Sequence, residues 1–86
     1  MNLAHIAKAV RINDAMKRRR DQVRLLLGER YRNEVALGQD VIRAVMEADK
    51  LEAVPATLKL CKEAQSHGHD TAVSILIAAL VEMLEA

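Results

Sequence analysis

The sequence of 86 residues has almost no aromatic side chains, because Tyr31 is its single aromatic residue. Aromatic residues bury the most area per side chain, so Leu, Val, Ile and Ala must build the core instead. Ala and Leu lead the helix-propensity ranking, and three glycines and one proline leave few breaks. The composition therefore predicts an all-α protein with a single domain over residues 1–86.

Cysteine and long apolar runs are also scarce. Cys61 is the sole cysteine, which excludes a disulfide within the chain and with it the class of disulfide-stapled secreted domains. The longest apolar run, Ile75–Val81, is far shorter than the roughly 20 residues of a membrane span. Lys8 and Arg11 interrupt the first twelve residues, unlike a signal peptide. We expect a soluble, cytoplasmic protein that does not enter a membrane.

Groups suited to catalysis or metal binding are few. Ser and Thr occupy only four positions, and no nucleophile–base–orienter set or Gly-rich phosphate loop is evident. Cys61, His67 and His69, with Asp70 as a fourth ligand, are the best metal candidates. Their spacing differs from the paired C-x2-4-C or H-x3-5-H pattern of zinc sites. We expect a buried cysteine and two turn histidines, with no metal, no cofactor and no enzymatic activity.

Hydrophobic periodicity divides the chain into four to five helices. Leu3, Ile6, Ala7 and Val10 share one helical face, and a turn or kink is expected near Asn13 and Asp14. Further helices are expected at about Ala15–Leu37, Asp40–Lys50, Pro55–Ser66 and Thr71–Glu85. The short connection Gly68–Asp70 should fold the last two into a C-terminal antiparallel helical hairpin in a small bundle.

Two glycines in the first half receive different roles. Gly28 lies within a pattern that continues past it, so we expect close approach by a neighbouring helix. Gly38 follows Leu37 and precedes Asp40, which is typical of a glycine just past a helix end. The apolar residues expected in the core from this half are Met16, Val23, Leu26, Leu27, Val41, Ile42, Val45 and Met46.

The last expected helix is apolar around its whole circumference, and few polar residues such as Ser74 and Glu82 interrupt it. Such a helix is normally buried on all sides, and the other short helices of one chain are expected to cover only part of it. We therefore predict a homodimer, with the alternative that this helix lies centrally within one chain. The expected association surface is Ile75, Leu76, Ile77, Leu80 and Leu84.

Charge is distributed unevenly along the chain. Residues 1–43 hold ten Lys and Arg against five acids, a net +5, while residues 44–86 hold three against seven, a net −4. Such asymmetry favours binding over catalysis. The candidate electrostatic surface is a basic arc of Lys17, Arg18, Arg20, Arg24 and Arg32. Asp21 and Glu29 dilute it, so it is either an ordinary solvated face, a protein-binding patch or a contact for nucleic acid. The charges beside the apolar arc form an exposed edge or pair with the acidic C-terminal half; they are Arg19, Arg20, Arg30 and Glu34.

The leading hypothesis is a small non-enzymatic protein-binding module: a regulator, an adaptor or an inhibitor. An inhibitor encoded by a mobile element is one version of it. An apolar helix face and an Arg-rich rim would receive an acidic protein partner. The alternatives are a nucleic-acid-binding accessory protein that contacts phosphates through Lys17–Arg32, and a structural subunit of a larger assembly. Whether Glu82 and Glu85 cover the basic arc distinguishes the protein-binding module from the nucleic-acid-binding protein.

Overall fold

A computed structural model describes residues 14–85, which form helices and no strand. The elements are α2 (Asp14–Leu27), the 3-10 turn η1 (Gly28–Arg30), α3 (Tyr31–Asp49), α4 (Ala53–Ser66) and α5 (Asp70–Glu85). The prediction of an all-α protein is confirmed for these residues. The expected helix around Leu3–Val10 and the expected turn at Asn13 lie outside the described residues.

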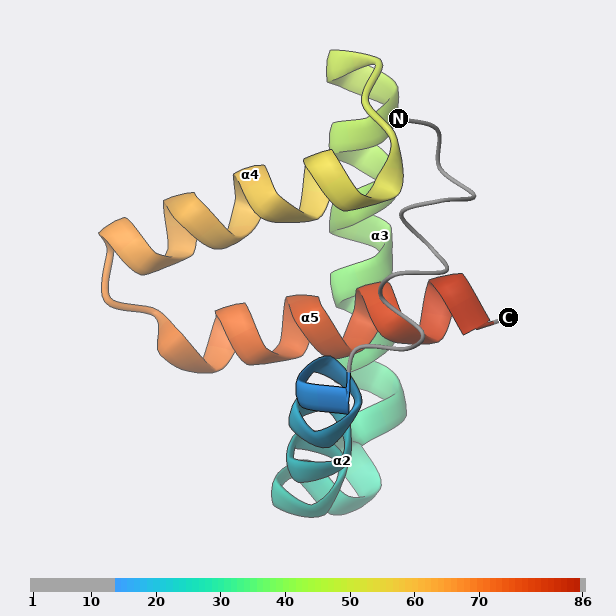
Figure 1. Ribbon diagram of the computed structural model, residues 1–86, viewed down its shortest axis with the longest axis vertical. Coiled ribbons are helices and arrows are strands. Elements are labelled where there is room, and N and C mark those ends of the chain that lie inside the picture. The colour runs from blue at the N-terminus through green and yellow to red at the C-terminus, as the bar shows by residue number, and fades with distance from the viewer. Residues whose placement is uncertain (1–13, 86) are drawn as a thin grey trace.

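The last helix, α5, lies at the centre of the fold. α4 runs alongside it, α3 crosses behind it and α2 packs against it from below (Figure 1). Its buried residues are Val73, Leu76, Ile77, Ala78, Ala79, Leu80, Val81 and Leu84. The expectation that one chain could cover only part of this helix is therefore wrong. Because α2 and α3 cross α5 instead of running parallel to it, three helices reach it from different sides.

The roles predicted for Gly28 and Gly38 are exchanged in the structure. Gly28 has φ +56, a left-handed conformation that glycine adopts without steric cost, and it separates α2 from α3. Gly38 is buried in the middle of α3, where an added Cβ would lie 3.1 Å from Cβ of Ala79 and 3.6 Å from Cγ2 of Ile75. The continuous helix expected over Ala15–Leu37 is thus wrong, and close approach occurs at Gly38.

The other helix ends are the start and end of α3 and of α4. α3 begins at Tyr31, not at Asp40, and Lys50 follows it with φ 54. α4 begins at Ala53, so Pro55 lies in its first turn, where backbone N–H groups have no acceptor within the helix. Gly68, with φ +71, ends α4 as predicted, and the following N–H of His69 donates to the carbonyl of Ala64 at 2.8 Å.

Two residues predicted for the core are exposed. Val41 is 46% exposed and Leu26 is 73% exposed, whereas their neighbours Ile42 and Val23 are buried. Successive residues of a helix point about 100° apart. Val41 therefore points away from the core face that holds Ile42. Leu26 is three positions from Val23 and lies on the same side of α2, but it is at the C-terminal end of that helix, where it stays exposed.

The contact between Gly38 and Ala79 can be tested by a double-mutant cycle. Gly38→Ala gains about 1 kcal/mol of helix propensity, but its new methyl group presses on Ala79. In an Ala79→Gly background that pressure is absent, so Gly38→Ala should be more favourable there by at least about 0.5 kcal/mol. Denaturant unfolding of the four proteins measures this coupling.

Gly28→Ala serves as the control for this cycle. It should cost on the order of 1–2 kcal/mol because its backbone conformation is left-handed, and no added Cβ contact is found there. Its cost should be the same in both backgrounds. Equal effects of Gly38→Ala in both backgrounds would show that Ala79 does not restrict Gly38.

Candidate functional site

Part of the basic arc, on α2, meets the acidic end of α5. Nη1 of Arg20 lies 2.5 Å from Oε2 of Glu85, and Nη2 of Arg24 lies 3.1 Å from Oε1 of Glu82. Lys17 is 4.0 Å from Glu85. These pairs bring together residues from opposite halves of the sequence. The structure therefore explains part of the charge asymmetry as an internal interaction between the two halves.

Tyr31, the first residue of α3, joins this cluster. Its hydroxyl donates a hydrogen bond to Oε1 of Glu82 at 2.8 Å, and the guanidinium of Arg24 lies 5.1 Å from the ring centroid, within cation–π range. Burial of the phenol, followed by the hydrogen bond to Glu82, raises the pKa of Tyr31 to about 12. Glu82 therefore ties α2, α3 and α5 together at one end of the fold.

Three of the five residues of the basic arc are engaged in this way: Lys17, Arg20 and Arg24. Arg18 and Arg32 are exposed. Arg32 lines a groove of about 630 Å³ that Glu29 and Glu82 also line, so the charge in this groove is mixed. Glutamates next to the cations weaken the field that a surface for phosphates needs.

The residues predicted to meet a second chain lie mostly in the core of this one. Leu76, Ile77, Leu80 and Leu84 are buried, and Ile75 is half-buried. This placement corrects the expected association surface. These apolar residues are covered, and the cover comes from α2, α3 and α4 of the same chain.

The candidate metal ligands differ in their exposure to solvent: the cysteine is buried and the histidines are exposed. Cys61 is buried in α4 as predicted, and burial raises the pKa of its thiol against the opposing effect of Arg19. His67 and His69 are exposed at the end of the same helix, with ring centroids 6.0 Å apart. Over residues 14–85, no three His, Cys, Asp or Glu side chains gather as they would around a metal ion.

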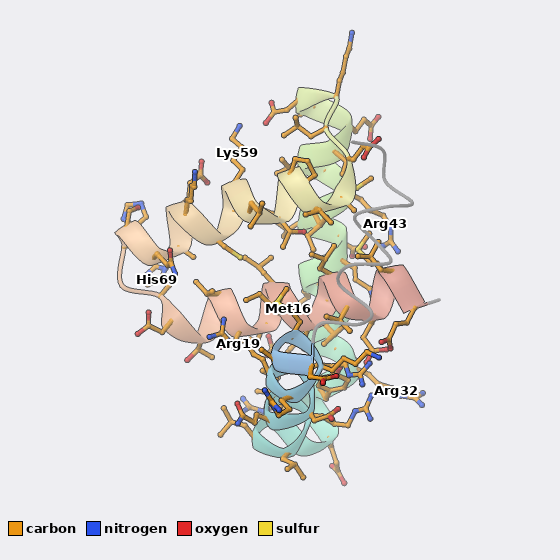
Figure 2. All side chains as sticks on the ribbon, viewed as in Figure 1. Met16, Arg19, Arg32, Arg43, Lys59 and His69 are labelled. Carbon is orange, nitrogen blue, oxygen red and sulfur yellow. The ribbon has the colours of Figure 1, made fainter. Side chains whose placement is uncertain are left out.

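Sequence reasoning missed an apolar groove of about 330 Å³ between α2 and α4, with α5 as its floor. Figure 2 shows Met16 and Arg19 where α2 meets α5. The groove is lined by Met16 and Arg19 of α2, by Val54, Thr57, Leu58, Cys61, Lys62 and Gln65 of α4, and by Val73, Ile77 and Leu80 of α5. The sequence does carry a signal for one wall, because Val54, Leu58 and Cys61 recur at i, i+4 and i+7 on α4.

No known family, curated protein or solved structure matches this chain. Among the helices of residues 14–85, none combines the length and the apolar character that crossing a membrane requires.

The sole tyrosine makes the Glu82 cluster measurable by its own absorbance. Because the pKa of Tyr31 is raised from 10.0 to about 12, its contribution to stability is complete below pH 10 and is lost as the pH rises through 12. The ultraviolet absorbance of the phenolate should show a midpoint near 12, and Glu82→Gln should lower that midpoint while leaving it above 10, since burial is the larger cause. A wild-type midpoint at 10 would contradict this packing of Tyr31.

Proposed function

We propose that this protein binds an amphipathic helix of a partner protein in the groove between α2 and α4. The observation that carries the proposal is the composition of the groove. Its walls and floor are mostly apolar, its two charged residues, Arg19 and Lys62, are both positive, and none of its lining residues is acidic. An amphipathic helix laid in an apolar groove is a recurring mode of peptide recognition, and here its flanks would be acidic.

The exposed apolar surface of α4 supports this mode of binding. Leu58 is 57% exposed at the groove, and burying such a side chain against a partner contributes about 1.5–3 kcal/mol when burial is complete. A groove of this volume receives the side chains along one face of a helix, not the whole helix. The proposal requires α4 and α5 to act as the antiparallel helical hairpin that the sequence predicts, since α4 is one wall and α5 is the floor.

The charges of the groove would contribute more to selectivity between partners than to binding affinity. Arg19 and Lys62 are exposed, and exposed ion pairs contribute only about 0.2–1 kcal/mol each. The same charges attract an acidic helix during encounter and repel a basic one. The charge of Arg19 also acts on Cys61 in the α4 wall, where it opposes the rise in the pKa of the thiol. Affinity therefore comes from the apolar contacts and selectivity from the cations.

This function needs only one copy of the chain, because α2, α4 and α5 complete the groove. It agrees with a non-enzymatic regulator, adaptor or inhibitor and does not depend on the expected homodimer. Nucleic acid is the weaker candidate, since Lys17, Arg20 and Arg24 pair with Glu82 and Glu85. A free thiol suits the reducing cytoplasm, where we place the interaction.

Two synthetic helical peptides with the same leucine face test this function. One carries glutamate flanks and the other lysine flanks. The acidic peptide should bind the protein and slow the reaction of Cys61 with a thiol reagent, because Cys61 lines the groove. The basic peptide should give at least about tenfold weaker protection of Cys61, since two attractive contacts become repulsive.

Two variants assign the binding to the groove. Leu58→Asp should abolish protection of Cys61 by the acidic peptide, because a carboxylate would be buried against an apolar face. Leu25→Asp is the matched control: Leu25 is 84% exposed and does not line the groove, so protection should be unchanged. Circular dichroism checks that both variants keep their helices. Full protection of Cys61 in Leu58→Asp would place the peptide elsewhere and overturn the proposal.

A further inference from the structure

α3 carries a second apolar face that none of the other helices described over residues 14–85 covers. Leu37 is 61% exposed and Val41 is 46% exposed, and Ala44 and Ala48 are exposed on the same side of the helix. These four residues, the α3 stripe, are separated by four, three and four positions, the spacing of a seam between two packed helices. The face of α3 turned to the core holds Tyr31, Val35, Gly38 and Ile42 instead.

Acidic residues border this stripe. On a helical wheel Asp40 and Glu47 lie along one side of it and Glu34 along the other, so the nearest charges on both flanks are negative. Asp40 and Glu47 are exposed and Glu34 is half-buried. Arg43 reaches Asp40 at 3.3 Å, but it lies beyond Asp40, away from the stripe. The sign is opposite to that of the groove between α2 and α4.

The charge of the residues beside the stripe distinguishes between two candidate occupants, a second copy of this chain and a helix of another protein. A second copy that packed its own α3 stripe here would bring glutamates and aspartates of both chains together, and like charges across a helix seam are unfavourable. A helix with lysines and arginines beside its apolar seam would pair with the same acids. We propose that the α3 stripe docks an amphipathic helix of a partner protein whose apolar seam has basic flanks.

The shape of the stripe adds a second element of selectivity. Leu37 and Val41 project from one half, whereas Ala44 and Ala48 leave room for close approach in the other. A helix that packs well against it carries its larger apolar residues opposite the two alanines. With the groove on α2 and α4, the chain then has two helix-binding faces of opposite charge preference and can bridge two different partners. The inference about α3 stands independently of the proposed groove.

A labelled helical peptide with a leucine seam and lysine flanks tests the α3 stripe on the full chain. The protein used is Leu58→Asp, in which the groove is disabled. Fluorescence anisotropy should show that it binds this peptide at least about tenfold more tightly than a control peptide with the same leucine seam and glutamate flanks. Val41→Asp should weaken binding of the lysine peptide at least tenfold, and Val41→Leu should retain it. Asp40→Lys with Glu47→Lys should reverse the preference between the two peptides.

Three results would overturn this inference. The first is equal binding of the two peptides in the Leu58→Asp background. The second is self-association of the wild-type chain that Val41→Asp abolishes in light scattering, which would make a second copy the occupant. The third concerns residues 3–11, which carry an apolar pattern with Lys8 and Arg11. If the lysine peptide binds only after Leu3→Asp with Ile6→Asp, the chain's own N-terminal segment is the occupant.

Discussion

The fold depends on the need to bury α5 on nearly every side. A helix with this composition cannot leave a broad face in water, and the chain satisfies that requirement by crossing α2 and α3 over it and running α4 alongside it (Figure 1). Gly38 allows α3 to approach Ala79 closely, while α2 and α4 cover the remaining sides. Where α5 reaches the surface, Glu82 and Glu85 become accessible, and Arg20 and Arg24 of α2 meet them. The interaction of the two oppositely charged halves is thus a consequence of how the apolar helix is covered.

Elements with a strong local signal could be predicted from the sequence, and elements set by packing could not. Pro55 and Gly68 mark the ends of α4 because the ring of proline and the left-handed backbone of glycine act locally. Gly28 and Gly38 both lie in apolar patterns that continue on either side. Periodicity does not reveal whether a glycine is needed for its φ angle or for the space that a missing Cβ leaves. The left-handed φ of Gly28 and the position of Ala79 beside Gly38 distinguish these two roles.

For the candidate surfaces too, some features could be predicted from the sequence and others depend on packing. The sequence indicated that residues such as Leu76 and Leu80 must be covered, and they are. It could not indicate that the cover comes from the same chain, because the crossing angles of the helices depend on side chains far apart in sequence. Apolar repeats on α3 and α4 were visible, including Leu58 on α4. Which side of a helix stays exposed is decided only when the others are packed, so the groove and the α3 stripe required the structure.

Internal pairing also changes the meaning of the charge asymmetry. With Lys17, Arg20 and Arg24 facing glutamates, the positive half no longer presents one uninterrupted cationic surface to a polyanion. For the two proposed binding faces, the relevant charges are then the local ones that border each apolar surface: Arg19 and Lys62 at the groove, and Asp40 and Glu47 beside the α3 stripe. At physiological salt the field of an exposed charge is screened over about 8 Å. The field at each apolar face is therefore set mainly by its own flanking charges, so the two proposed surfaces can differ in charge preference without either cancelling the other.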